Sequence, residues 1–304
     1  MLKSLNSDSI PLLAGIEVGG TKFKCAVATQ DLKILRSKSI DTSSPKETLN
    51  QVRDFFLSCQ SDIRYISSIG IGCFGPAQIN RLSTRYGYIE TTPKQGWSNT
   101  NVLGFFKKFF HAPLAFDTDV NVAARSEFEL GAAKSYENFA YVTVGTGIGV
   151  SVYMGGNVAK GTSHFESGHQ LVPRHPFDKE FVGVCDFHDD CLEGFASGPS
   201  IEKRWGKNPE KIPDDHMAWD IEGYYLGILC VNLTLNYRPE KIILGGGVMN
   251  RRCLFKKIRQ NYKFLMGSYL EQNLPLDKFI VPAHLSNDSG VIGALLLAKN
   301  EISE

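Results

Sequence analysis

Two stretches of the chain share one pattern: an apolar strand, a glycine turn and a second strand with alternating apolar residues. They read LLAGIEVGGTKFKCAVA at 12–28 and AYVTVGTGIGVSVYMGG at 140–156. A buried strand that runs into glycines also occurs twice, at residues 69–76 and 242–249. Internal similarity of this kind indicates two copies of one structural unit. We therefore expect a duplicated α/β protein with glycine turns in both copies.

The glycine turns point to an anionic ligand. Backbone N–H groups of such turns face a bound anion, and glycine lets a phosphate approach closely. Two turns on the walls of a cleft between the copies suit a nucleotide polyphosphate. The turn at 19–20 is not a Walker A loop, because Thr-Lys follows the glycines, the reverse of the order in that motif. It is not a Rossmann fingerprint, because a strand and not a helix follows the glycines. Tight hairpins without a ligand are the alternative.

Helical spacing occurs at residues 45–60, in the strand-to-helix segment 115–133, at 215–238 and in the final segment 286–300. We expect the last of these to be a capped amphipathic helix that packs back on the N-terminal half. Cys25, Cys73 and Cys230 lie in apolar runs and are expected in the core.

The composition excludes several classes of protein. The 304 residues carry 33 basic and 32 acidic side chains, a net charge of +1, so charge favours neither nucleic acid nor a membrane surface as partner. We expect no signal peptide and no transmembrane helix. Seven cysteines, an odd number, then indicate reduced thiols and a cytoplasmic protein.

One loop has the spacing of a metal site. His169, Cys185, His188 and Cys191 follow the pattern His-x15-Cys-x2-His-x2-Cys. Two cysteines and two histidines suffice for a closed tetrahedral zinc site, which has no open position for water. We therefore expect structural zinc and no metal catalysis. The alternative is a surface loop with idle cysteines and histidines.

Five motifs, in order along nearly the whole chain, resemble those of the ROK family of sugar kinases. They are GIEVGGTKFKCAV, FDTDVNVAARSE, VGTGIG, ESGH followed by CDFHDDCLE, and LGGGVM. The Cys-x2-His-x2-Cys loop, TTPKQGW and ASGPSIEKRWG are similar to those of bacterial fructokinases. Thr118 stands where many members have Asn, and Glu17 where actin-like folds often have Asp.

The resemblance implies a duplicated actin-like ATPase fold of the ribonuclease H-like group, with two lobes and a central cleft for nucleotide and sugar. We expect the N-terminal lobe at residues 10–118 plus 286–304. The C-terminal lobe, with the zinc-binding loop, is expected at 119–285.

The resemblance also implies roles for single residues. Asp119 is the expected catalytic base, with a helix N-cap as the alternative reading of its position. Glu166, His169 and Glu193 are expected to contact sugar hydroxyls, and His169 to bind zinc with its other ring nitrogen. The expected ATP-binding residues are Gly19, Gly20, Thr21, Lys22, Thr146, Gly147, Pro199, Gly245, Gly246 and Gly247. Mg²⁺ is expected with the ATP.

The function that the resemblance implies is ATP-dependent phosphorylation of a hexose, which we expect to be fructose, giving fructose 6-phosphate. Glucose, mannose and N-acetylmannosamine are the alternative acceptors, because pocket geometry decides between hydroxyl arrangements. A non-catalytic sugar-sensing protein and a sugar-responsive repressor are hypotheses of another class. A homodimer is the assembly that the family implies.

Overall fold

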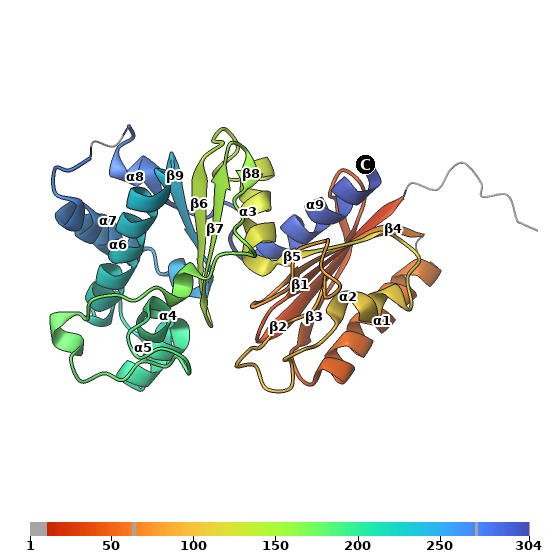
Figure 1. Ribbon diagram of the computed structural model, residues 1–304, viewed down its shortest axis with the longest axis horizontal. Helices are drawn as coiled ribbons and strands as arrows, with labels where there is room; N and C mark the ends of the chain where they lie inside the picture. The colour runs from red at the N-terminus through yellow and green to blue at the C-terminus, as the bar shows by residue number, and fades with distance from the viewer. Residues whose placement is uncertain (1–10, 63–64, 271–272, 304) are drawn as a thin grey trace, which may run out of the picture. The chain divides into compact units, whose positions relative to one another are not determined.

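The computed structural model describes residues 11–62, 65–270 and 273–303 (Figure 1). These residues form two compact units: the chain up to Arg125 and from Gly290 onward makes the first, and Ser126–Ser289 the second. Residues 1–10, where we expect no signal peptide, lie outside the described residues. The lobe boundaries expected from the motifs stay a prediction.

The first unit is built on a five-stranded sheet in the order β3-β2-β1-β4-β5. Its strands are β1 (Leu12–Val18), β2 (Lys22–Ala28), β3 (Ile34–Asp41), β4 (Ile66–Cys73) and β5 (Leu114–Thr118). Strand β2 pairs antiparallel with both β1 and β3, whereas β4 is parallel to β1 and β5 is parallel to β4.

The second unit repeats this topology, with the sheet order β10-β9-β6-β7-β8. Its strands are β6 (Phe139–Val144), β7 (Ile148–Met154), β8 (Asn157–Val158), β9 (Lys241–Gly245) and β10 (Ile280–Pro282). Strands β6, β7 and β8 are antiparallel and β9 and β10 are parallel, as in the first unit. The predicted duplication of one α/β unit is therefore confirmed.

Helices connect the strands in both units. They are α1 (Pro45–Asp62), α2 (Val102–Lys107), α3 (Asp119–Leu130), α4 (Leu192–Ala196), α5 (Gly198–Trp205), α6 (Ala218–Tyr237), α7 (Cys253–Met266), α8 (Leu276–Phe279) and α9 (Ser289–Ser303). Short 3₁₀ turns are η1 (Ser167–His169), η2 (Pro176–Asp178), η3 (Pro209–Lys211), η4 (Gly247–Asn250) and η5 (Ser286–Asp288). None of the helices in the described part of the chain combines the length and hydrophobicity that crossing a membrane requires.

The core of the first unit follows the alternation of its central strand. Leu12 and Ile16 on β1 pack with the apolar side of α1, including Phe56. Leu13 points to the opposite face of the sheet and packs against Leu295 of α9. Figure 1 shows α9, in blue, beside the red and orange strands of this unit. The expectation that the last helix packs on the N-terminal half is confirmed.

The last helix differs from the expectation in two respects. It begins at Ser289, because residues 286–288 form a separate 3₁₀ turn. It is buried on more than one side, since Leu295 faces the sheet while Leu297 packs with Val122 of α3. A Cβ on Gly293 would overlap the carbonyl oxygen of Val122, so the two helices are in close contact. The helix is therefore mostly apolar instead of amphipathic.

The core of the second unit centres on α6, which the sequence predicts at 215–238. Its residues are buried on most of its circumference, and it packs along α7. The helix ends at Tyr237, and its C-cap residue Arg238, directly before Pro239, has a left-handed φ of 48°. Cys230 is buried in this core, as are Cys25 and Cys73 in the first unit, and all three are free thiols.

Candidate metal cluster and active site

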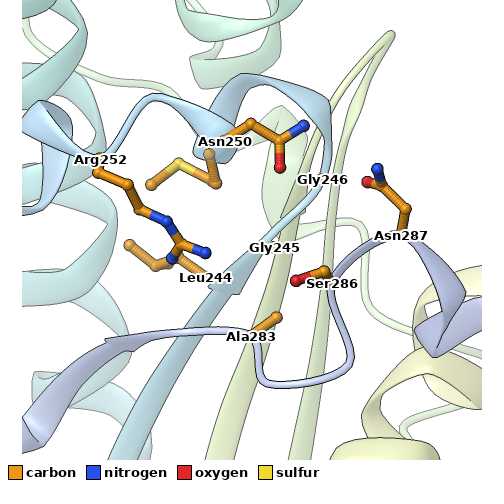
Figure 2. A pocket seen from close by; sticks show the side chains of 9 residues that line it. Leu244, Gly245, Gly246, Asn250, Arg252, Ala283, Ser286 and Asn287 are labelled. Atoms are coloured by element: carbon orange, nitrogen blue, oxygen red, sulfur yellow. The ribbon is translucent and has the colours of Figure 1, made fainter.

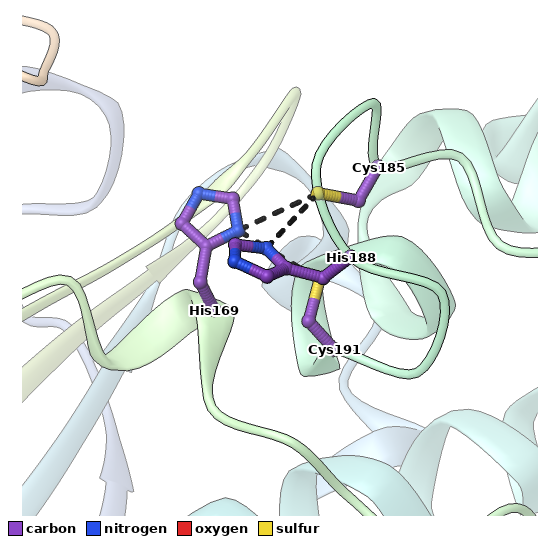
Figure 3. A group of neighbouring side chains, drawn as sticks. All are labelled: His169, Cys185, His188 and Cys191. Atoms are coloured by element: carbon purple, nitrogen blue, oxygen red, sulfur yellow. Dashed lines mark hydrogen bonds between the residues drawn. The ribbon is translucent and has the colours of Figure 1, made fainter.

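Four side chains of the second unit meet at one point (Figure 3). One ligand atom from each of His169, Cys185, His188 and Cys191 lies within 4.8 Å of the others. Nδ1 of His169 is 3.7 Å from Sγ of Cys185 and 3.7 Å from Sγ of Cys191. Tetrahedral zinc, with bonds of about 2.3 Å to sulfur and 2.0–2.1 Å to nitrogen, separates such atoms by about 3.5 Å. The predicted ligand set therefore has the geometry of a metal site.

The loop that carries the cluster is tied to its surroundings. Leu171 and Cys191 form an antiparallel bridge, which brings the chain after His169 beside the last ligand. The guanidinium of Arg174 donates to Oδ1 of Asp190 through both Nε, at 3.0 Å, and Nη2, at 2.6 Å. Its Nη1 donates to the carbonyl oxygen of Phe181, at 2.8 Å. These contacts position the ligands from both sides of the loop.

The sulfur atoms lie in surroundings that suit metal-bound thiolates. The backbone N–H of Gly194 donates to Sγ of Cys191, at 3.3 Å, and the N–H of Phe187 donates to Sγ of Cys185, at 3.5 Å. Burial raises the pKa of the Cys191 thiol to about 12, against the lowering effect of the Gly194 N–H. A thiolate at this position thus needs a cation beside it at neutral pH, and metal binding would release its proton.

His169 also faces away from the cluster. Its Nε2 lies 3.7 Å from Oε1 of Glu193, the second residue of α4. Oε2 of Glu193 accepts the backbone N–H of Ile148, at 2.8 Å. Ile148 follows Thr146 and Gly147, the turn between β6 and β7. One carboxylate therefore connects the metal cluster with the second glycine turn.

Glu166 lies near this carboxylate. Its Oε1 is 3.4 Å from Nδ1 of His164, and 46% of its side chain is exposed. Burial raises the pKa of Glu166; His164 and His169 oppose the rise, and Glu193 adds to it. The structure thus brings together the three residues that we expect to contact sugar hydroxyls, within the second unit.

The second glycine turn contacts two further expected nucleotide-binding segments. The backbone N–H of Gly198 donates to the carbonyl oxygen of Gly145, at 2.8 Å. Pro199 follows as the second residue of α5. A Cβ on Gly198 would lie 3.8 Å from Cγ2 of Val248, in the turn after β9. The start of α5, which contains Pro199, therefore lies beside both glycine segments of the second unit.

A pocket opens where β9 and β10 end (Figure 2). It is lined by Leu244, Gly245, Gly246, Met249, Asn250, Arg252, Ala283, Ser286 and Asn287. Gly246 has a φ of 90°, and a Cβ there would overlap the carbonyl oxygen of Val144, so only glycine fits. Gly245 and Gly246, two of the three glycines that we expect here to bind ATP, thus form a wall of this pocket. Gly247 is open, with no atom within 4 Å of a Cβ placed on it.

Asp119 is the first residue of α3 in the first unit. The capping role belongs to its neighbour, because Oγ1 of Thr118 accepts the N–H of Asn121, at 3.2 Å. Asp117 is buried and accepts from the Asn121 side chain, at 2.7 Å, which makes it structural. The half-buried carboxylate of Asp119 accepts the N–H of the next residue, Val120, at 2.8 Å. Thr118 therefore caps the helix, and a capping role does not explain the aspartate at position 119.

The first glycine turn joins β1 and β2. The N–H of Gly19 donates to the carbonyl oxygen of Lys22, at 3.1 Å, and Oγ1 of Thr42 donates to the carbonyl oxygen of Gly19, at 2.8 Å. Gly20 has no neighbour within 4 Å of an added Cβ, and Thr21 and Lys22 are exposed. The turn is thus a tight hairpin whose tip is accessible to a ligand.

Two buried glutamates of the second unit have no role in the sequence analysis, although Glu127 is the last residue of the motif FDTDVNVAARSE. Glu127 on α3 is fully buried and accepts several hydrogen bonds. Glu222 on α6 is buried too, and neither of its carboxyl oxygens has a hydrogen-bond partner among the described residues.

Comparison with known sequences places the chain in one family. The profile of the ROK family matches residues 13–301. The chain is similar to a fructokinase of Pediococcus pentosaceus, with 45% identity over 95% of this chain and 98% of the relative. It is also similar to a fructokinase of Zymomonas mobilis, with 40% identity over 93% of this chain and 95% of the relative.

Solved structures agree on the fold. A ROK hexokinase from Thermus thermophilus has a TM-score of 0.76 at 22% identity, covering 96% of this chain and 99% of that chain. A ROK family glucokinase from Streptomyces griseus, solved in complex with glucose and AMPPNP, has a TM-score of 0.77 at 19% identity, covering 95% and 99%. The predicted actin-like ATPase fold is confirmed. With the family profile matched over nearly its whole length, this chain belongs to the ROK family.

Proposed function

We propose that this chain is an ATP-dependent fructokinase that converts fructose to fructose 6-phosphate. The observation that carries the proposal is the identity of 39–45% with enzymes named fructokinase, over about 95% of the chain. The contact of Glu193 with both His169 and the second glycine turn supports it, because a sugar kinase needs hydroxyl-binding carboxylates close to a phosphate-binding turn.

The chemistry requires a base at the sugar hydroxyl and donors around the phosphates. Asp119 takes the proton from the attacking hydroxyl. Backbone N–H groups of the two glycine turns, at 19–22 and 146–147, bind the β- and γ-phosphates. Gly245–Gly247 and Pro199 border the nucleoside. Mg²⁺ accompanies ATP, held mainly by phosphate oxygens and water, and neutralises charge on the transferred group.

Glu166 and Glu193 accept hydrogen bonds from sugar hydroxyls, and the Nε2 side of His169 faces the same region. A zinc ion in the cluster has a structural role, since four protein ligands leave no position for substrate or water. ATP as donor and seven cysteines that form no disulfide in the structure are consistent with an enzyme of the cytoplasm. A homodimer remains the assembly to test.

The proposal is tested by ADP release in a coupled assay with Mg²⁺-ATP. Fructose, glucose, mannose and N-acetylmannosamine are compared at matched concentrations. We expect kcat/KM for fructose to exceed that for each other sugar by about tenfold or more, since a site built for one hydroxyl pattern leaves polar groups unpaired with another. A preference for another hexose reassigns the acceptor. An absence of turnover on all four, with folded and zinc-loaded protein, overturns the kinase assignment.

A further inference from the structure

The carboxylate of Glu127 accepts hydrogen bonds from four groups inside the second unit. Its Oε2 accepts the N–H of Ala132, at 2.7 Å, and of His284, at 3.1 Å. Its Oε1 accepts the N–H of Leu285, at 2.9 Å, and the hydroxyl of Ser289, at 3.2 Å. The side chain is fully buried. Each oxygen therefore accepts two hydrogen bonds, and these four donors are all uncharged.

Three of these donors belong to one segment, residues 283–289, which joins β10 to α9. The same segment contributes Ala283, Ser286 and Asn287 to the pocket of Figure 2, opposite Gly245 and Gly246. Buried backbone N–H groups in an irregular segment need acceptors, and here the acceptor comes from another element. Glu127 therefore fixes the backbone of the pocket wall while it does not line the pocket itself.

The other end of this connection is α3. Glu127 lies in the C-terminal half of the helix that begins at Asp119. Ser289 is the first residue of α9, and α9 contacts α3 again where Gly293 meets Val122. The chain passes from one unit to the other within these two helices, after Arg125 and after Ser289. One buried carboxylate thus joins the two helices beside the points where the chain changes unit.

We infer that Glu127 is a positioning residue for the nucleotide. It holds segment 283–289 on α3, and so keeps Ser286 and Asn287 at the nucleoside pocket and couples that wall to the helix that carries Asp119. The inference rests on the proposed function, since it takes the pocket beside Gly245 and Gly246 to be where the nucleoside of ATP binds. It assigns to Glu127 an effect on nucleotide affinity and none on the fructose-binding carboxylates.

Replacing one carboxylate oxygen tests this role. In one orientation of the amide in Glu127→Gln, the new NH₂ group faces the N–H groups of Ala132 and His284, and both hydrogen bonds are lost. In the other orientation it faces the N–H of Leu285, and that bond is lost, while the Ser289 hydroxyl can accept from the NH₂ and donate to the Ser286 carbonyl. Either way a backbone N–H of segment 283–289 loses its acceptor. We expect the Kd for ADP, measured by isothermal titration calorimetry, and the KM for ATP to rise about tenfold. The KM for fructose should stay within about twofold of wild type. Glu127→Asp, which keeps both oxygens on a shorter chain, should restore part of the affinity.

Glu222→Gln is the matched control. It changes a second fully buried glutamate of the same unit, but one whose oxygens have no hydrogen-bond partner among the described residues. We expect it to leave both the Kd for ADP and the KM for fructose unchanged. Ser289→Ala is the milder variant for the case that Glu127→Gln does not fold. It removes one of the four donors, and we expect a two- to threefold weaker ADP affinity.

These measurements distinguish a failure of the inference about Glu127 from a failure of the proposed function. An unchanged ADP affinity in Glu127→Gln, or in Ser289→Ala where the former does not fold, overturns the inference. So does a KM for fructose that rises in step with the Kd for ADP, because that would indicate general damage to the unit. If the wild type binds ADP but phosphorylates no sugar, the proposed function fails while the ADP titrations of the variants still decide the role of Glu127. A wild type that does not bind ADP overturns both.

Discussion

Nε2 of His169 lies 3.7 Å from Oε1 of Glu193, while Nδ1 of the same ring faces the two sulfur atoms of the metal cluster. The other oxygen of Glu193 holds the N–H of Ile148 beside the second glycine turn. A ligating imidazole has a fixed ring orientation, and the partner of its second nitrogen is fixed with it. A metal in the cluster would therefore orient Glu193, and so affect the sugar site without contacting the phosphates.

The first prediction concerns the metal. Cys185→Ser removes one of two sulfur ligands, and we expect the purified protein to lose most of its zinc, as measured by inductively coupled plasma mass spectrometry. Because His169 then loses its fixed orientation, the KM for fructose should rise about tenfold, whereas the KM for ATP should change little. Removal of the metal from the wild type by a chelator should have the same effect.

The control for this prediction is Cys253→Ser. Cys253 is also a half-exposed free thiol of the second unit, but it lies at the start of α7 and outside the cluster. It should keep both zinc and fructose affinity. A Cys185→Ser protein with full zinc content and an unchanged KM for fructose would refute the structural role of the cluster.

The second prediction concerns Glu193. In Glu193→Gln one carboxylate oxygen becomes an NH₂ group and the negative charge is lost. In one orientation of the amide the NH₂ group faces the Ile148 N–H, whose 2.8 Å hydrogen bond is then lost; in the other it faces Nε2 of His169, 3.7 Å from the original oxygen. We expect the KM for fructose to rise about tenfold, with zinc content unchanged. Glu180→Gln, an exposed change in the preceding loop, is the control, and equal kinetics for the two variants would contradict the prediction.

The third prediction concerns Asp119. Asp119→Asn preserves the shape of the side chain but removes the base, so kcat should fall by about 10²–10⁴-fold. Thermal stability and zinc content should stay close to wild type, because the helix is capped by Thr118. Asp117→Ala should show the opposite pattern, a loss of stability with most of the turnover kept, since Oδ1 of Asp117 accepts both from the Asn121 side chain and from the Thr118 N–H. Turnover by Asp119→Asn at the wild-type rate would exclude it as the base.

The duplication could be read from the sequence because it depends on local patterns. Apolar alternation and glycine turns mark β1, β2, β6 and β7, and the metal ligands lie in one loop apart from His169. Strand β3 was not predicted from the sequence, because its side chains are mostly exposed and polar and show no apolar alternation. Strands β8 and β10 have two and three residues, which is too short for any period to be visible.

The buried glutamates could not be predicted for a different reason. A glutamate in a helical pattern is ordinarily assigned to solvent, because charged side chains are rarely buried without partners. The partners of Glu127 at His284 and Leu285 are 157 and 158 residues away in the chain, so its burial depends on contacts within the second unit between segments far apart in the sequence. Such long-range contacts have no local sequence signal.

The last prediction concerns Glu222 and pH. Burial raises the pKa of Glu222 well above its ordinary value of 4.5; Arg204 opposes this rise, and Asp178 adds to it. Arg204 is already paired with Asp178, at 2.8 Å, so it compensates little. The folded protein thus holds a proton that the unfolded chain releases above about pH 4.5. Stability must then fall as pH rises from there to the folded pKa, by up to about 1.4 kcal/mol per pH unit.

Glu222→Gln removes this linkage with a neutral side chain of the same shape. We expect the variant to match the wild type near pH 4.5–5 and to gain in relative stability as pH rises, with the difference in urea midpoint measured at pH 5, 6, 7 and 8. Glu202→Gln, at an exposed position on α5, should show no such trend. A difference between Glu222→Gln and wild type that stays constant over this range would mean that Glu222 is ionised in the folded protein, stabilised by Arg204 after all.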